Sequence, residues 1–450
     1  MKCRINMPPQ LESIVEDIAE KGGASYLVGG AVIDSIQGRA AKDWDIEVYK
    51  LSISELEKVL SGYGSPNLVG QSFGIIKLKF EDVEYDFSVP RRENKIGLKH
   101  QDFNIELRPD IAPEEAALRR DLTINSMYID LSSMDIVDPY HGLDDLNSGI
   151  IRHTSYKFSE DPLRVLRIMQ LLPRKGRVVA PETMDLCRAL VNQYSTLPAE
   201  RVFEEWNKLL MKAEKPSVGM DFLADSGWIV HYPELNSLRT TAQNPDWHAE
   251  GSVWNHTQMV VDCASLLKQY IPEEWKKPFM YGALLHDAGK PATTTKDLKS
   301  HGHDQAGVPL AKSFMQRITA EKELADRVLN IVEYHMAPGD LSRSNAKDSA
   351  WKRLHNKIPL NIIAYMSKAD AGGRAGSSLN DYHEPSEKAL RFFEEYGAEP
   401  IPPVLMGKHL IEAGYEPGPI IGKLLKKAYE IQIEEKIYDK EELLKRAVIA

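Results

Sequence analysis

Two aspartates set in a strand-like pattern constrain the fold of this chain more than any other feature. The segment reads KDWDIEV, so charged and apolar side chains alternate along it. Successive side chains of an extended strand point to opposite faces, so Trp44, Ile46 and Val48 are expected in a core. Asp43 and Asp45 then lie side by side on the other face. Adjacent carboxylates repel unless a cation lies between them, and their oxygens suit Mg²⁺ bound together with substrate phosphates.

A pair of glycines about a dozen residues upstream gives this aspartate pair a context. Gly29 and Gly30 follow an apolar run (26–28) and precede a helix-like segment (31–37). Glycine lets backbone N–H groups approach a polyphosphate closely. An Asp-x-Asp alone is also found at exposed strand edges, but together with the glycines it predicts a site for a nucleoside triphosphate.

Length and composition limit the class of protein to which this chain can belong. The 450 residues indicate roughly three domains, and 42% hydrophobic with 27% charged residues is typical of a globular chain. No apolar run reaches membrane-spanning length and no signal-peptide core is found, so we expect a cytoplasmic protein with no membrane partner. The three scattered cysteines form neither a zinc ribbon nor a disulfide framework, which fits a reducing cytoplasm.

The net charge of −10 argues against a general polyanion binder. Any contact with nucleic acid must therefore come from local basic surface. The candidate basic runs are Arg91-Arg92, Arg119-Arg120, Arg174-Lys175-Arg177 and Lys423 to Lys427.

Along the chain, a mixed region is followed by helical regions. A hairpin is expected over Ile76–Phe80 and Val83–Val89, turning at Glu81-Asp82, with Glu84 and Asp86 on its polar face. Helical periods follow at 162–172 and 199–211, and two final helices are expected near 407–413 and 419–434. The predicted domains are 1–150, 151–245, 246–380 and 381–450.

Two downstream motifs supply groups that can read a nucleotide. In the segment RRDLTINSM, Arg119 and Arg120 stand beside polar side chains, and arginine binds phosphate in a bidentate manner. Asp121 or Asn125 would then hold ribose hydroxyls. The alternative is a helix end stabilised by its own cations.

The second motif pairs a carboxylate with a guanidinium. Pro162 is a good first residue of a helix, and Asp161 and Arg164 share one face of it. The acid would accept from the exocyclic amine of cytosine or adenine while the arginine donates to the neighbouring ring acceptor. Uracil and guanine would leave buried groups unpaired, which costs more than a missing contact. The alternative is a surface ion pair worth about 0.2–0.5 kcal/mol.

The order of these motifs resembles the class II tRNA nucleotidyltransferases, the family of the CCA-adding enzymes and bacterial poly(A) polymerases. The resemblance implies an α+β protein with a polymerase-β-like nucleotidyltransferase head, then an all-helical neck and body, and a helical tail. The matching segments are Leu27–Val32 with Asp43 and Asp45, Arg119–Met127, Asp138–Leu146, Glu160–Arg167 and Pro198–Val202.

The resemblance also implies roles for residues. Asp43 and Asp45 would be the catalytic aspartates and bind two Mg²⁺, which activate an RNA 3′-hydroxyl and stabilise the leaving pyrophosphate. Asp86, on a neighbouring strand, is the candidate third metal carboxylate, and Glu84 is the alternative. The residues expected at the nucleotide are Gly29, Gly30, Arg120, Asp121, Asn125, Asp161, Arg164 and Arg167, with Asp161 and Arg164 acting as a protein template for C or A.

Some residues depart from the family pattern. Ile33 stands where the family often has arginine, which is expected to weaken triphosphate binding. Leu122 and Ser126 replace the common Phe and Ala. The polar segment from Arg91 to about Asp110 is similar to the family's flexible loop, which is needed for the switch from C to A.

A second set of ligands lies further along the chain, where six of the 13 histidines fall between His248 and His335. Imidazole and carboxylate ligands together suit a divalent transition metal with open positions for water. The ordered pattern resembles the HD phosphohydrolases, as fused in CCA-adding enzymes of the multifunctional type. The implied metal ligands are His256, His286, Asp287 and Asp370, and His303 and His335 would add a second metal.

By this resemblance the HD domain hydrolyses phosphate esters, such as 2′,3′-cyclic phosphates or 2′-nucleotides, through a metal-bound hydroxide. Met336 follows His335 where that type has an acidic residue, which speaks against full hydrolase activity.

The sequence therefore predicts a template-independent tRNA nucleotidyltransferase with a fused HD phosphohydrolase. Its expected partners are tRNA, CTP and ATP, and the sequence indicates no oligomeric state. The alternatives are a poly(A) polymerase or A-adding enzyme of the same family, and a phosphohydrolase whose head only binds RNA.

Overall fold

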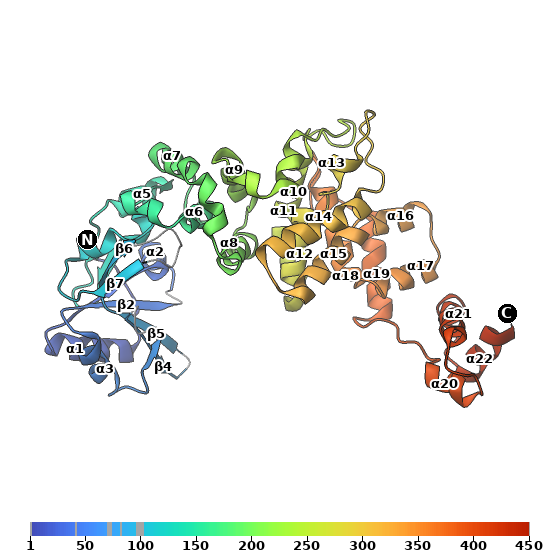
Figure 1. Cartoon of the computed structure of the whole chain (residues 1–450), viewed down its shortest axis with the longest axis horizontal. Coiled ribbons are helices and arrows are strands. Elements are labelled where there is room, and N and C mark those ends of the chain that lie inside the picture. Colours follow the sequence, from blue (N-terminus) through green and yellow to red (C-terminus); the bar gives the residue numbers. More distant parts are fainter. Residues whose placement is uncertain (1, 41–42, 70–73, 82, 96–102, 450) are drawn as a thin grey trace. The chain divides into compact units, whose positions relative to one another are not determined.

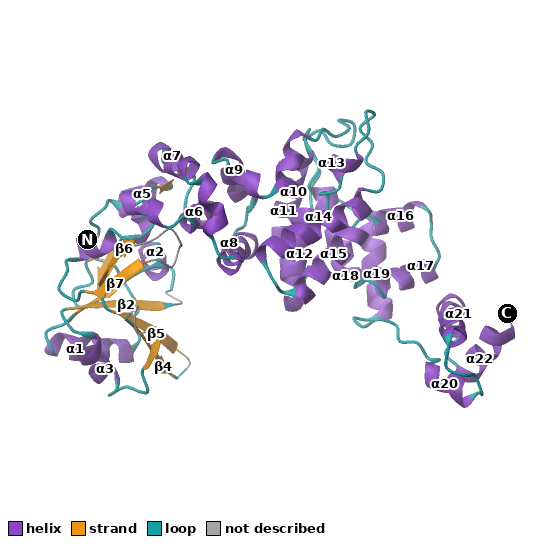
Figure 2. Ribbon diagram, viewed as in Figure 1, coloured by secondary structure: helices purple, strands orange, loops and turns teal. Residues whose placement is uncertain are grey.

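The structure, a computed structural model, describes residues 2–40, 43–69, 74–81, 83–95 and 103–449. It divides into two compact units (Figure 1). Residues 1–209 with 218–231 form the first unit, and residues 210–217 with 232–450 form the second. Strands β1 to β11 all belong to the first unit, and the second is built from helices and loops (Figure 2). The finer division into four domains stays a prediction.

The first unit is built around a mixed β-sheet. Its strand order is β3-β4-β5-β2-β1-β8-β9, and β2 pairs antiparallel with β1 but parallel with β5. Helix α1 (Pro9–Glu20) packs against β1 and against α3 (Ile53–Leu60). The strands are β1 (Ala24–Leu27), β2 (Trp44–Tyr49), β3 (Asn67–Val69), β4 (Ile75–Phe80), β5 (Val83–Ser88), β8 (Tyr128–Asp130) and β9 (Ile136–Val137).

The alternation predicted for β2 is confirmed. Trp44, Ile46 and Val48 are buried, whereas Asp45 is half-buried and Asp43 is exposed just before the strand. The predicted hairpin is also confirmed as β4 and β5. Its expected turn falls partly on residue 82, which lies outside the described residues.

Short helices and strand pairs complete the first unit. The predicted helices at 162–172 and 199–211 are confirmed as α6 and α8. Strands β6 (Arg91–Lys95) and β7 (Phe103–Leu107) pair antiparallel, and residues 96–102 of the predicted flexible loop lie outside the described residues. The other elements are α2 (Gly30–Ile36), α4 (Pro113–Ala117), α5 (Gly142–Ser148), β10 (Ile150–Ile151), α6 (Leu163–Lys175), β11 (Val178–Val179), α7 (Pro181–Ala189), α8 (Ala199–Lys212) and α9 (Ser217–Asp225).

The second unit is a helical assembly in which α11 packs against α12 and α18, and α14 against α15. At its C-terminal end the two predicted helices are found as α20 and α21, and the structure adds α22, which the sequence analysis missed. The helices are α10 (Pro233–Asn236), α11 (Val253–Leu267), α12 (Glu273–Leu285), α13 (Lys290–Thr293), α14 (His303–Ile318), α15 (Lys322–Tyr334), α16 (Ala337–Arg343), α17 (Asp348–His355), α18 (Leu360–Gly372), α19 (Glu384–Tyr396), α20 (Gly407–Glu412), α21 (Pro419–Glu435) and α22 (Lys440–Ile449).

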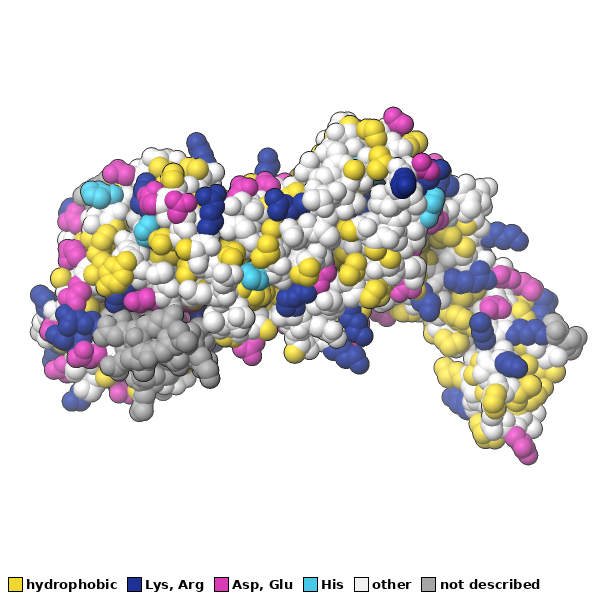
Figure 3. Space-filling model, turned by 45° about the horizontal axis from the view of Figure 1, so that its top comes forward, with side chains coloured by type: hydrophobic (Ala, Val, Ile, Leu, Met, Phe, Trp, Pro, Cys, Tyr) yellow, Lys and Arg dark blue, Asp and Glu magenta, His cyan; other side chains and the backbone are white. Residues whose placement is uncertain are grey.

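Across the described residues, no helix combines the length and the apolar character needed to cross a membrane. On the face shown in Figure 3, Lys and Arg side chains lie scattered among Asp and Glu side chains.

Candidate nucleotide pocket and metal centre

The glycine pair lies against the aspartate strand. Gly29 follows β1 with φ of 76°, a backbone conformation that favours glycine, and α2 begins at Gly30. A Cβ at Gly29 would lie 3.1 Å from Asp45 Oδ2. The Val28 N–H donates to the Asp45 carbonyl at 2.9 Å, which fixes the glycine backbone beside this carboxylate.

The sheet register brings a second carboxylate to Asp45. Asp45 in β2 is the direct partner of Asp86 in β5, whereas Glu84 is exposed and pairs with Lys77. Burial raises the pKa of Asp45, and the charges of Asp86 and Asp43 raise it further. Carboxylates that oppose one another's ionisation favour a cation. Lys77 Nζ lies 3.2 Å from Asp86 Oδ1.

Buried Glu47 holds the two arginines of the next motif. Its carboxylate accepts from Arg119 at 2.6 Å, from Arg120 at 3.4 Å and from the Tyr49 hydroxyl at 2.9 Å. Burial raises the pKa of Glu47, but the two guanidinium groups outweigh this effect and lower it. Arg120 also lies over the Tyr128 ring, 4.9 Å from its centroid.

Asp121 organises the polar groups beside these arginines. Its Oδ1 accepts from Asn125 Nδ2 and from the Leu122 N–H, both at 2.9 Å, and its Oδ2 accepts from Arg167 Nε at 2.6 Å. Burial raises the pKa of Asp121, but Arg167 and Asn125 bring it down to about 2. The ionised carboxylate therefore fixes the orientation of Asn125 and Arg167.

The predicted template residues are held by different partners. Arg164 donates to the carbonyl oxygens of Lys157 at 2.6 Å and Arg119 at 2.5 Å. Asp161 accepts from Arg201 of α8 at 3.3 Å and from the Leu163 N–H at 3.1 Å. Asp161 is thus linked to α8, a contact that the sequence analysis did not predict.

All eight residues predicted to bind the nucleotide line one cavity of about 570 Å³ in the first unit. Six arginines and three aspartates line it, so the cavity carries an excess of positive charge that suits a polyphosphate. The lining residues are Gly29, Gly30, Asp45, Arg91, Arg119, Arg120, Asp121, Asn125, Asp161, Arg164, Arg167, Leu171 and Arg201.

The predicted histidines converge in the second unit, and all four fix their rings in the same way. The Nδ1 atom of each lies within hydrogen-bond distance of a backbone carbonyl. The distances are 3.2 Å from His256 to Gly373, 2.8 Å from His286 to Ala283, 2.7 Å from His303 to Ser300 and 2.7 Å from His335 to Val332. An N–H at Nδ1 leaves the Nε2 lone pair for a metal.

The Nε2 atoms then face each other and the two aspartates. His256 Nε2 lies 3.0 Å from Asp370 Oδ1, and His303 Nε2 lies 3.1 Å from His335 Nε2 and 3.2 Å from Asp287 Oδ1. Buried His286 Nε2 has no hydrogen-bond partner within the described part of the chain. Burial lowers the pKa of His335 to about 4, which keeps its ring in the neutral form that binds metals.

Besides the group His248/Glu250/His256, two overlapping ligand sets result, His256/His286/Asp287 and Asp287/His303/His335, each with ligand atoms within 4.8 Å of one another. Asp287 belongs to both. Buried imidazoles together with carboxylates fit one or two divalent metal ions. Among the described residues of the first unit, no three such side chains bring their ligand atoms within the same distance of one another.

Comparisons with known proteins match both units. Residues 25–152 match the Poly A polymerase head domain, residues 178–238 the probable RNA and SrmB- binding site of polymerase A, and residues 253–372 the HD domain. A multifunctional CCA protein of Aliivibrio salmonicida is 32% identical over 420 residues, which cover 90% of this chain and 97% of the relative. Another, from Hahella chejuensis, is 34% identical over 372 residues, which cover 79% of this chain and 84% of that relative.

This chain belongs to the family of multifunctional CCA proteins. The predicted family is therefore confirmed, as are the α+β fold and the class of a CCA tRNA nucleotidyltransferase with an HD phosphohydrolase domain.

Solved structures share the fold. A crystal structure of the Bacillus stearothermophilus CCA-adding enzyme in complex with CTP has a TM-score of 0.67 at 18% identity and covers 98% of this chain and 99% of that one. The Thermotoga maritima CCA-adding enzyme complexed with tRNA_CCA has a TM-score of 0.60 at 17% identity. The match covers 100% of this chain and 99% of that one.

Three residues that support these sites were given no role by sequence reasoning. Glu47 and Arg201 are described above. Glu250 is the third: its Oε1 lies 3.0 Å from His256 Nδ1 and 2.7 Å from His248 Nδ1, and it also accepts from the Ala375 N–H at 3.1 Å. The only sequence signal for Glu250 was its place two residues after His248, in a segment typical of a loop.

In two of the predicted basic runs most cations are not surface side chains, although Arg177 is exposed. The Arg119, Arg120 and Lys175 side chains are only 18%, 12% and 11% exposed. They pair with Glu47 or, for Lys175, with Asp34 at 2.8 Å. These three cations therefore form ion pairs within the first unit and are largely shielded from solvent.

Proposed function

We propose that this chain adds CCA to tRNA 3′ ends from CTP and ATP in the first unit, and hydrolyses phosphate esters at the HD centre of the second. The gathering of all eight predicted nucleotide-binding residues around one arginine-rich cavity carries the first assignment. Related CCA-adding enzymes were solved in complex with CTP, ATP and tRNA, which supports the same partners for this chain. The free cysteines of the described chain support a cytoplasmic location.

In the first unit, the glycine backbone and the arginines would bind the triphosphate. Asp43, Asp45 and Asp86 would hold Mg²⁺, because Asp86 is the strand partner of Asp45. Bound Mg²⁺ supplies activation of the RNA 3′-hydroxyl and charge stabilisation of pyrophosphate. Asp161 would accept from the amine of cytosine or adenine, with Arg164 as donor.

In the second unit, His256, His286, Asp287 and Asp370 would hold one divalent metal. His303 and His335 would hold a second, with Asp287 shared between them. Such a metal supplies a hydroxide nucleophile near neutral pH. The expected substrates are 2′,3′-cyclic phosphates or 2′-nucleotides.

The nucleotidyltransferase assignment is tested with tRNA transcripts that end before CCA, after C or after CC. Each is incubated with the full chain, Mg²⁺ and labelled CTP, ATP or both, and the products are resolved at single-nucleotide resolution. Completion of CCA followed by arrest supports the proposal. Long A tails would instead identify a poly(A) polymerase, addition of a single A only to the CC-ended tRNA would identify an A-adding enzyme, and no incorporation on any transcript would refute all three.

A further inference from the structure

A guanidinium group lies beside the HD centre without belonging to the predicted ligand set. Arg374 follows α18, one helical turn after Asp370, and its terminal nitrogen lies 3.8 Å from Asp370 Oδ2. The other oxygen of Asp370 lies 3.0 Å from His256 Nε2. Within the described chain, the buried Nε of Arg374 has no hydrogen-bond partner. The Arg374 side chain as a whole is 40% exposed, so its terminal nitrogens can reach a ligand.

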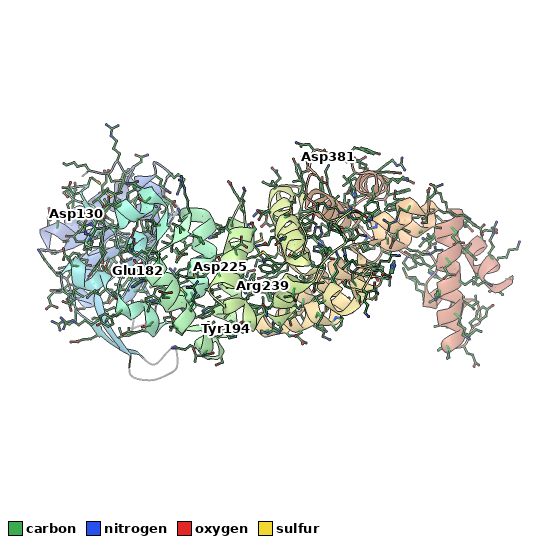
Figure 4. All side chains as sticks on the ribbon, turned by 90° about the horizontal axis from the view of Figure 1, so that it is seen from above. Asp130, Glu182, Tyr194, Asp225, Arg239 and Asp381 are labelled. Atoms are coloured by element: carbon green, nitrogen blue, oxygen red, sulfur yellow. The ribbon has the colours of Figure 1, made fainter. Side chains whose placement is uncertain are left out.

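Arg374 also lines a cavity of about 220 Å³ formed by the end of α18 and the segment before α19. Lys368 provides a second cation, and the hydroxyl groups of Ser377 and Ser378 provide neutral donors. Asp381, seen in Figure 4, also lines this cavity, but its Oδ2 accepts from the Ser378 N–H at 2.7 Å. Lys368 Nζ lies 3.7 Å from Glu387 Oε1, which is longer than a close ion pair, so both cations keep N–H donors for an anionic ligand.

The segment that closes the cavity is fixed to the metal centre. The Ala375 N–H donates to Glu250, the carboxylate that also contacts His256. A Cβ at Gly372 would come within 2.7 Å of the Leu379 side chain, so the segment also packs closely on α18. Glu250 therefore contacts both the wall of the cavity and a predicted metal ligand.

An aromatic ring stands at the same cavity. Tyr382 lines it and is 79% exposed, far more than expected for a tyrosine used in packing. An exposed aromatic ring beside a cationic cavity is the arrangement with which proteins stack a nucleobase while they bind its phosphate. A phosphate alone would need no such ring.

We propose that this cavity is the substrate subsite of the HD centre, in which Arg374 binds a phosphate oxygen and Tyr382 stacks on the base of a nucleoside phosphate ester. The inference rests on the proposed phosphohydrolase function and assigns the residues that select its substrate. Arginine presents two parallel N–H donors to phosphate, which lysine does not.

Direct binding tests the subsite. Adenosine 2′-monophosphate and inorganic phosphate are titrated into the full chain with Mn²⁺ by calorimetry. Arg374→Ala should weaken adenosine 2′-monophosphate roughly tenfold to a hundredfold and also weaken phosphate. Tyr382→Ala should weaken adenosine 2′-monophosphate about tenfold but leave phosphate unchanged, while Tyr382→Phe keeps the affinity. Tyr156→Ala, at a 72% exposed tyrosine of the first unit, is the matched control.

Hydrolysis of 2′,3′-cyclic AMP, followed in parallel, separates this inference from the proposed function. If the unmodified chain hydrolyses nothing but its binding of adenosine 2′-monophosphate depends on Arg374 and Tyr382, the subsite stands and the hydrolase assignment fails. If hydrolysis proceeds and both alanine variants bind the nucleotide and keep KM as the unmodified chain does, the subsite is overturned.

Discussion

Replacing Asp121 with asparagine tests how the nucleotide pocket is organised. The substitution keeps the shape of the side chain but removes the charge that meets Arg167 Nε at 2.6 Å. One oxygen remains for the N–H groups of Leu122 and Asn125, whereas the new amide presents hydrogens to the arginine. Arg167 therefore loses its acceptor and its fixed orientation in Asp121→Asn.

The magnitude follows from the pKa of Asp121, which moves from 3.8 to about 2 on folding. At about 1.36 kcal/mol per pKa unit this corresponds to about 2.5 kcal/mol of stability. Because the folded pKa is the lower one, this contribution is complete above pH 5 and is lost as the pH falls through about 2. The difference between wild type and variant should therefore fall to about half by pH 3.

Hydrogen exchange of the peptide 119–127 measures the local opening free energy, and steady-state kinetics measure KM for CTP and ATP. In Asp121→Asn, the free energy of local opening of the segment 119–127 should be about 2.5 kcal/mol lower at pH 7. Both KM values should rise about tenfold. Asp144→Asn, at a carboxylate that is 84% exposed, is the matched control and should change neither. An Asp121→Asn variant with wild-type exchange and KM would refute this reasoning.

Two further variants probe the supporting carboxylates. Glu47→Gln removes the charge between Arg119 and Arg120, so KM for both nucleotides should rise about tenfold. The free energy of unfolding of the first unit, measured in urea, should fall by about 3 kcal/mol. An unchanged KM would show that Glu47 does not position these arginines. Glu250→Gln should weaken metal binding at the HD centre about 10-fold to 100-fold in calorimetry while CCA addition is unaffected. Glu273→Gln, at an 84% exposed side chain of the same unit, should bind metal normally, and equal affinities for both variants would contradict the role of Glu250.

Local patterns along the chain were sufficient to predict the elements that carry the sites. The alternation around Asp45 predicted both the buried face of β2 and the acidic face, and proline at position 162 predicted the start of α6. The ordered motifs predicted the family, because each motif is short and continuous in sequence. Such features depend on neighbours in the chain, which a single sequence displays.

Contacts across the fold were not predictable in this way. The alternation placed Glu47 on the polar face, but its partner Arg119 lies 72 residues later and only the folded sheet brings them together. Asp86 was predicted as a candidate beside Asp45, but the choice between Asp86 and Glu84 needed the register between β2 and β5, which neither strand alone encodes. Glu250 lies 125 residues from Ala375, so its link between α11 and the segment after α18 was also invisible.

Two independent metal-dependent sites are expected in this one chain. The most direct test compares Asp45→Asn and Asp287→Asn, each assayed for CCA addition to tRNA and for hydrolysis of 2′,3′-cyclic AMP. Asp45→Asn should abolish addition and keep hydrolysis, while Asp287→Asn should do the reverse. Loss of both activities in both variants, with folding retained, would contradict the independence of the two sites.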